Sequence, residues 1–551
     1  MSEAFTGEER AALAPYFTNL DGPVFALVNL PEVVKGALFA RYSRSPKSLR
    51  RLFLDEFVKG GLEAAVARGT TWAPGEIATQ RAEALYERVF VEYGDDSVAQ
   101  LGGVHLACEG ASNVLTKVLE WGRLMAYLEQ STRYIPYDDR PGGRYRYHVP
   151  DELTDALRER YVATLDRAFD TYAAWLPRMR EFYAARFPPA AGDSEPVHRM
   201  SIRAKALDTL RGMLPAATVS NVGIYATGQA YEQLLLRMRA HPLAEARAYA
   251  DLMLVELRRV IPAFLRRVDV PDRGGAWSRY LADTRAAVGA LAARLLADDK
   301  PEHRDEVTLT DFDPEGEIKV VAAALYAASA LPDDQLLARA AAMTAEERAQ
   351  VLRAYVGRRG NRRHRPGRAL ERTAYRFDVL TDYGAFRDLQ RHRLLSLEWQ
   401  RLSPRHGYVV PEAVLEAGAG EDWRRVMDDA AALHDAIAGA GLAEVAPYAV
   451  AMAYRVRFYM DMNAREAMHV IELRTAPQGH PSYRRVCQAM HRLIAAQAGH
   501  RAIAAAMGFA DHSEVALERL EAERAAERRR GASPAAPPAT GSIPIPPSTG
   551  R

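Results

Sequence analysis

The densest group of phosphate-binding side chains in the sequence is Arg391, His392 and Arg393, with Ser396 three residues later. A guanidinium group makes paired hydrogen bonds with phosphate oxygens, and an imidazole adds a single donor or acceptor. The group therefore suits a phosphorylated cofactor or nucleotide. A solvated, charged helix face would show the same residues, so the triplet alone does not decide between these interpretations.

A second polar group, Glu129, Ser131 and Arg133, places a carboxylate, a hydroxyl and a guanidinium at alternate positions. It can bind a nucleotide, or its Ser and Glu can simply cap a helix end. The surrounding segment, Leu119 to Tyr134, has a shape similar to that of Arg387 to Arg405. This similarity indicates that the chain is an internal duplication.

The segment Arg387 to Arg405, RDLQRHRLLSLEWQRLSPR, resembles the signature of the flavin-dependent thymidylate synthases, the ThyX family. Downstream, Asn463, Arg465 and His469 match the family's N-x-R-x-x-x-H stretch, and a spacing of four puts Arg465 and His469 on one helical face. The resemblance implies that FAD binds to six residues of the second half: Arg391, His392, Arg393, Asn463, Arg465 and His469.

The nucleotide side of the family pattern falls in the first half. Glu129, Ser131 and Arg133 match its E-x-S-x-R segment, and Arg211 of LRGMLP matches a further phosphate-binding arginine. Each half has lost what the other keeps: Trp121 and Gly122 replace the first Arg-His, whereas Trp399 and Arg401 replace the second Glu and Ser. The resemblance therefore implies one composite site between the halves.

Two further arginines are candidates for stabilising negative charge on the uracil ring. Arg237 precedes Arg247 by ten residues, and Arg474 precedes Arg484 by the same ten. We interpret this shared spacing as a common position in the two halves. The resemblance implies that Arg474 contacts the pyrimidine, and Arg237 is the corresponding candidate in the first half.

The pattern predicts an α+β fold made of two homologous ThyX-like halves, each a helix-rich domain around a small twisted sheet. We place the halves at residues 1–290 and 301–525, followed by a disordered tail rich in Pro and Ala at 526–551. Apolar spacing predicts three long helices, at Glu152–Arg186, Ala244–Arg267 and Glu421–Ala440. Aromatic and β-branched runs predict strands at Arg144–Val149 and Tyr375–Leu380.

Composition limits the class of protein. The net charge of +2 provides no overall field for nucleic acid, so nucleic-acid binding is not expected. The two cysteines exclude a disulfide framework and a cysteine-rich zinc site, and no metal site is predicted. Without a signal peptide or a long apolar run, we expect no membrane segment and a cytoplasmic protein.

The run Gly357–Arg368, GRRGNRRHRPGR, contains six arginines. An exposed basic loop is the favoured interpretation, because charge runs are usually solvated. Alternatively, the loop could bind RNA, folate polyglutamate or the phosphate of NADPH.

The resemblance implies a methyltransferase that converts dUMP to dTMP with methylene tetrahydrofolate and reduced FAD, with NADPH as the reductant. It also implies a homodimer that imitates the family's tetramer. The sequence departs from the family at Asp388, where a Gln is usual, and at Asp95, Asp96 and Glu371, near which a His is usual. Two alternatives stay open: an inactive pseudoenzyme that binds nucleotide or flavin, and a flavoenzyme that acts on another pyrimidine.

Overall fold

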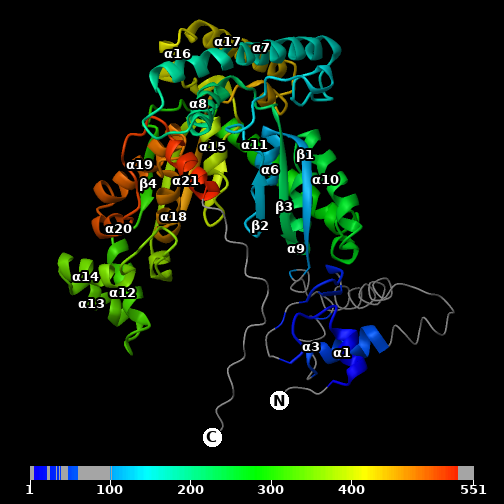
Figure 1. Cartoon of the computed structure of the whole chain (residues 1–551), viewed down its shortest axis with the longest axis vertical. Coiled ribbons are helices and arrows are strands. Elements are labelled where there is room, and N and C mark those ends of the chain that lie inside the picture. The colour runs from blue at the N-terminus through cyan, green and yellow to red at the C-terminus, as the bar shows by residue number, and fades with distance from the viewer. Residues whose placement is uncertain are drawn as a thin grey trace, which may run out of the picture.

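The computed structural model describes residues 5–21, 25, 27–32, 34, 35, 38, 47–59, 100 and 102–531, and it contains two small antiparallel sheets (Figure 1). The first has the order β1-β3-β2, with β1 at Gly103–Ser112, β2 at Met125–Glu129 and β3 at Val219–Thr227. The second has the order β4-β5-β7-β6, with β4 at Val307–Phe312, β5 at Ala374–Asp382, β6 at Ser396–Trp399 and β7 at Arg455–Asn463. Together with the helices, the sheets confirm the predicted α+β class.

Helices surround both sheets. Those of the first half are α1 (Gly7–Leu13), α3 (Leu49–Phe53), α6 (Asn113–Leu119), α7 (Asp155–Arg186), α8 (Glu195–Leu210), α9 (Gly228–Arg239), α10 (Ala244–Arg258) and α11 (Gly274–Leu295). Those of the second half are α12 (Gly316–Tyr326), α13 (Asp333–Ala342), α14 (Ala345–Val356), α15 (Tyr383–Leu389), α16 (Glu412–Glu416), α17 (Gly420–Gly439), α18 (Ala464–Arg474), α19 (Pro481–Ala496), α20 (Arg501–Ala506) and α21 (Leu520–Gly531). Within the described part of the chain, no helix combines the length and the apolar character needed to cross a membrane.

Both halves repeat one local design, in which a strand runs directly into a capped helix. Ser112 accepts from the Leu115 amide at the start of α6, and Asp382 accepts from the Ala385 amide at the start of α15. Thr227 and Asn463 cap α9 and α18 in the same way. Since short polar side chains are the preferred N-caps, each cap fixes where its helix begins. Equivalent positions in the two halves can therefore be found by counting residues from these four caps.

The halves lie side by side beneath a layer that contains α7 and α17 (Figure 1). Trp175 on α7 donates its indole N–H to Asp422 on α17 at 2.8 Å. Below these helices, the amide of Ala216 donates to the Val450 carbonyl at 2.8 Å, and the amide of Met452 donates to the Leu214 carbonyl at 2.9 Å. The halves thus share backbone hydrogen bonds as well as side-chain packing.

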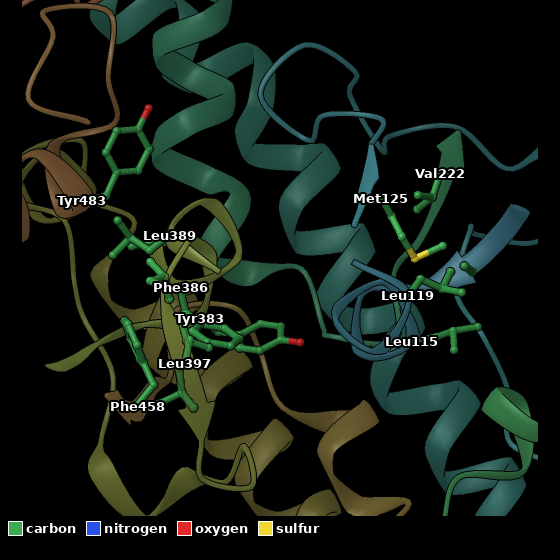
Figure 2. Packing of buried hydrophobic residues seen from close by; sticks show 14 of the residues in the cluster. Leu115, Leu119, Met125, Val222, Tyr383, Phe386, Leu389, Leu397, Phe458 and Tyr483 are labelled. Atoms are coloured by element: carbon green, nitrogen blue, oxygen red, sulfur yellow. The ribbon is translucent and has the colours of Figure 1, made fainter. Parts of the chain in front are cut away.

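The short helices α6 and α15 approach each other at the centre of the molecule. The Tyr383 hydroxyl donates to the Asn113 carbonyl at 2.9 Å, and the Gln390 amide donates to the Lys117 carbonyl at 3.0 Å. Figure 2 shows Tyr383 pointing from the second half's core towards Leu115 and Leu119 of the first. The start of α15 is therefore anchored to the opposite half.

Three sequence predictions are confirmed, because β5 contains Tyr375–Leu380, and α7 and α17 match the predicted long helices. The strand predicted at Arg144–Val149 is wrong, since only an isolated bridge between Tyr147 and Thr218 forms there. Tyr145 and Tyr147 instead donate to Asp170 and Asp166 on α7, so their alternation reflects packing against a helix.

The predicted helix Ala244–Arg267 is too long. α10 ends at Arg258, and Pro262 begins a short 3₁₀ helix, because proline cannot supply the amide that a continuing α-helix needs. The first residues of the predicted tail belong to α21, which continues to Gly531, and residues 532–551 lie outside the described residues. Asp95 and Asp96 also lie outside them.

Gly212 provides a test of the contact between the halves. A Cβ there would lie 2.6 Å from the Trp423 ring, across the interface. We expect Gly212→Ala to lower the free energy of unfolding by about 1–3 kcal/mol, as overpacking does. Chemical denaturation measures this change. The control is Gly289→Ala on exposed α11, where no atom lies within 4 Å of the new Cβ. Equal stability of the two variants would contradict the tight contact.

Candidate functional site

The candidate site is built around Asp388, near the C-terminal end of α15 and 7% exposed. Arg391 makes an ion pair with its carboxylate, and Nη1 of Arg474 and Nη1 of Arg211 each lie 3.6 Å from one of its oxygens. Burial opposes ionisation of Asp388, but Arg391, Arg474 and Arg211 together hold its pKa well below its usual range. Arg211 comes from the first half and the other two from the second, so the cluster is composite.

Glu129, at the end of β2, is the first half's carboxylate in this cluster. Its Oε1 accepts from Arg387 at 2.7 Å, and Oε2 lies 3.4 Å from Lys117 Nζ and 3.8 Å from Arg391 Nη1. Burial raises the pKa of Glu129, but Arg387 and Lys117 outweigh it and bring the pKa to about 2. Glu129 is therefore ionised and ties β2 to α15.

Arg133 is another of the residues that the sequence predicts to bind a nucleotide. Its guanidinium donates to both oxygens of Asp208 on α8, at 2.7 and 2.6 Å, and its Nη1 donates to the Tyr483 hydroxyl at 3.0 Å. The Ser131 hydroxyl accepts from the Arg133 amide at 3.2 Å. Arg474 lies 5.3 Å from the centre of the same Tyr483 ring. Tyr483 thus connects arginines from the two halves.

His392 links Arg474 to α18. Arg474 Nε donates to His392 Nε2 at 2.9 Å, and His392 Nδ1 lies 3.7 Å from Glu466. Burial, and then the charge of Arg474, lower the pKa of His392 well below its usual value, so the ring is neutral. Burial likewise raises the pKa of Glu466 to about 7. His392 therefore accepts from Arg474 and fixes that guanidinium at the edge of the site.

His392, Glu466 and His469 also offer ligand atoms within 4.8 Å of one another, close enough for a metal ion. However, Arg474 already donates to His392, and Arg365 lies 3.2 Å from Nδ1 of His469. Each histidine thus has an arginine next to one ring nitrogen. The two positive charges repel a metal ion, so the group favours an anionic ligand over a cation.

The other predicted FAD-binding residues have structural partners. Arg393 donates to the Met125 carbonyl of the first half. Asn463 caps α18, and Arg465 donates to the Pro366 carbonyl at 2.9 Å. The structure thus brings Arg391 and His392 to the composite cluster and places Asn463 and Arg465 at the N-terminal end of α18.

A cleft of about 840 Å³ lies beside this cluster and is lined by both halves. Its walls include Trp121, Trp277 and Tyr459, and its polar groups include Arg237, Arg393 and Ser396. The volume lies within the range of small-molecule sites, about 300–1,000 Å³. The aromatic side chains could stack on a planar ring and the arginines could bind phosphate, so the lining fits a cofactor such as FAD.

Arg237 lies in this cleft, 4.9 Å from the Trp121 ring, and not beside Arg474. It is ten residues after its cap, Thr227, whereas Arg474 is eleven after Asn463. One residue turns a helix by about 100°. The shared ten-residue spacing therefore does not mark equivalent positions, and Met238 takes the place that corresponds to Arg474.

The basic run at residues 357–368 is not simply an exposed loop. The side chain of Arg359 is 7% exposed and donates to both oxygens of Glu472 on α18, at 2.6 Å each. Arg365 reaches His469, as described above. The prediction is therefore wrong for Arg359, because a buried carboxylate on α18 requires a cationic partner.

Several residues of the cluster escaped the sequence prediction, namely Lys117, Asp208, Arg387, Glu466 and Tyr483. Arg387 carried a signal, since it heads the R-x-x-x-R-H-R segment and lies one helical turn before Arg391. Asp208 and Tyr483 carried none, because their roles depend on contacts between distant segments.

His480 provides a test by pH. It caps α19 through Nδ1 and lies 3.3 Å from the Asp208 carbonyl. Burial and Arg211 lower its pKa to about 3 from 6.5, so only the unfolded chain gains a proton just below pH 6.5. The contribution of His480 to the free energy of unfolding therefore falls as the pH falls, by about 2 kcal/mol between pH 6.5 and about 5.

We expect His480→Asn, which keeps a capping side chain, to remove this pH dependence from the free energy of unfolding measured by denaturation. His303→Asn, at an exposed position, is the control, and an unchanged profile for His480→Asn would contradict the assignment.

The chain is similar to known proteins over most of its length. A model of the family described as thymidylate synthase complementing protein matches residues 59–263 and 308–498, one segment in each half. A UPF0159 protein of Chlamydia pneumoniae is 37% identical over 524 residues, 95% of this chain and 98% of the relative. One from Thermoplasma acidophilum is 31% identical over 516 residues, 89% of this chain and 97% of the relative.

The resemblance seen in the motifs thus extends over the two halves and over nearly the whole length of these relatives. The chain belongs to the thymidylate synthase complementing protein family, that of the flavin-dependent thymidylate synthases, as a tandem of two such halves.

Proposed function

We propose that the protein is a flavin-dependent methyltransferase that converts dUMP to dTMP, with methylene tetrahydrofolate as the carbon donor. NADPH would reduce the flavin, and the setting would be the cytoplasm. The observation that carries this proposal is the convergence of arginines from both halves on one buried cluster. Arg133 and Arg211 come from the first half, and Arg391 and Arg474 from the second.

The charge of the cluster suits a nucleotide. Six cations face four carboxylates there, which leaves an excess of two positive charges, or three if Glu120, whose pKa burial raises, is protonated. The cations are Lys117, Arg133, Arg211, Arg387, Arg391 and Arg474, and the carboxylates are Glu120, Glu129, Asp208 and Asp388. A phosphate monoester carries a charge of about −1.5 to −2 at neutral pH. Such a ligand would bring the buried site close to neutrality.

Within this site, Arg474 is our candidate for the transition-state stabiliser. Its guanidinium is held by neutral His392 and by the Asp388 carbonyl, so it is oriented before a ligand arrives. A positioned positive charge stabilises negative charge that develops on a pyrimidine ring. FAD, held by residues of the 840 Å³ cleft, would supply the hydride chemistry when bound.

Only one such site is expected in each chain. Counted from the matching caps Ser112 and Asp382, Val118 takes the position of Asp388 in the first half, and Trp121 that of Arg391. The mirror-related position therefore lacks both the acid and the arginine. A homodimer, which the family resemblance implies, would bind two nucleotides.

Asp388 itself favours the main alternative, a site altered to take a different pyrimidine or to bind without catalysis. Its carboxylate already neutralises arginines that a phosphate would otherwise contact. We expect Asp388→Gln, the residue usual in the family, to tighten dUMP binding at least about tenfold, because one competing negative charge is removed. Isothermal titration calorimetry measures this. Weaker dUMP binding in a folded Asp388→Gln protein would favour the altered-ligand alternative.

Substitution should also separate the two ligands. We expect Arg393→Ala to lose FAD, because Arg393 lines the cleft proposed for FAD, whereas Arg133→Gln should lose dUMP and retain FAD, because Arg133 belongs to the nucleotide side. Flavin absorbance and calorimetry measure the two affinities. Arg199→Ala on α8, with a side chain 68% exposed, is the control for Arg133→Gln. The composite site would be refuted if both substitutions left both affinities intact.

The function is tested directly by adding FAD to the purified protein and recording its visible spectrum during dUMP titration. Incubation with methylene tetrahydrofolate and NADPH follows, with dTMP detected by mass spectrometry. A spectral shift and dTMP formation support the proposal. A shift without any dTMP would indicate a pseudoenzyme.

A further inference from the structure

A second cavity, also of about 840 Å³, lies between the halves near the C-terminal ends of α7 and α8. Arg211 lines it, but Asp388, Arg391 and Arg474 do not. From the second half it receives residues of α16, α17 and α19 and the segment from Glu514 to Glu518. It is therefore a different space from the composite cluster, and the two share Arg211 and Asp208.

Three residues that line this cavity each carry a buried polar atom with no hydrogen-bond partner among the described residues, namely Arg211 at Nη2, Trp423 at Nε1 and Asp382 at Oδ2. These residues are 4%, 1% and 7% exposed. Asp382 caps α15 through its other oxygen, and the ion pair of Arg211 with Asp388, at 3.6 Å, is longer than a hydrogen bond. Buried donors and acceptors normally find partners, so a group of three on one cavity points to a ligand.

The three residues belong to one end of the cavity. Arg211 Nη2 lies 3.1 Å, and Asp382 Oδ1 lies 3.0 Å, from the point where Gly384 would carry a Cβ. The Trp423 ring lies against Gly212, the neighbour of Arg211. Arg211, Asp382 and Trp423 are therefore neighbours at this end of the cavity.

The cations Lys205 and Arg485 on the cavity wall are already paired, and the wall also carries the exposed residues Glu412 and Glu514. Lys205 pairs with Glu518 at 2.5 Å, and Arg485 pairs with Glu306 at 2.7 Å. Much of the remaining wall is apolar and includes Tyr183, Phe187, Val410, Met452 and Val515. Among the buried groups of the described wall, those with an unpartnered polar atom thus gather at one end of a largely apolar space.

We propose that this cavity binds a small amphipathic organic anion. Its oxyanion would accept from Arg211 and Trp423, an adjacent N–H or O–H group would donate to Asp382, and its apolar body would contact the aromatic and aliphatic wall. Because Arg211 also faces Asp388, a ligand here competes for a guanidinium of the composite cluster. Occupancy of the cavity and nucleotide affinity are therefore coupled, and the coupling is reciprocal.

The probe for this site is 8-anilinonaphthalene-1-sulfonate, which combines a sulfonate, a secondary N–H group and an aromatic body. The experiment uses the folded, full-length chain without nucleotide and follows probe fluorescence and energy transfer from tryptophan. We expect saturable binding of one probe per chain. Addition of dUMP should then shift the apparent probe affinity.

Two substitutions remove single atoms of the proposed contact. Trp423→Phe deletes the indole N–H, and Asp382→Asn replaces a carboxylate oxygen while retaining a side chain that caps α15. Each should weaken probe binding about tenfold, the effect of losing one buried hydrogen bond. Trp175→Phe is the matched control, because that indole donates to Asp422 and does not line the cavity.

The proposal would be overturned by a wild-type protein that does not bind the probe, by non-saturable binding, or by equal affinity in both variants and the control. Thermal denaturation of each variant establishes that it is folded. Probe binding is measured without nucleotide, so it can succeed where dTMP formation fails. Failure of the two proposals is therefore distinguishable.

Discussion

The structure depends on the pairing of buried charges across the two halves. Arg387 of the second half and Glu129 of the first lie 2.7 Å apart with side chains almost wholly inaccessible to water. Burial of an unpaired ion costs several kcal/mol, so neither half could keep its own charges buried if the halves separated. The same constraint explains why the candidate site is composite, since the pairs Arg387–Glu129 and Arg211–Asp388 each join a cation of one half to a carboxylate of the other.

The tandem of two halves keeps one backbone design while its side chains differ. The four helix caps preserve the backbone design in both halves, because each cap satisfies amides at a helix start whatever the chemistry of the site. Side chains beyond the caps were free to diverge. At corresponding positions, Arg391 and Trp121 now face different surroundings, one a charged cluster and the other an aromatic cleft wall.

Asp388 gives the site its most distinctive electrostatics. A carboxylate among Arg211, Arg391 and Arg474 orders these groups before any ligand binds. It also offsets part of the charge that attracts an anion. Asp388 therefore orients the arginines for a ligand and at the same time lowers the affinity of the site for an anion. Arg211 has a further role, because it connects this cluster to the second cavity.

The sequence by itself determined the duplication, the long helices α7 and α17, the strand β5 and half of the ten charged residues of the cluster, because these depend on local periodicity and short motifs. It misjudged Arg144–Val149, whose alternating tyrosines pack on α7, and it paired Arg237 with Arg474 although one residue of helix turns them apart. Only the tertiary structure decided that Asp208, Tyr483 and Glu466 join the site and that Arg359 is buried. These contacts join segments far apart in the chain, and no local spacing encodes them.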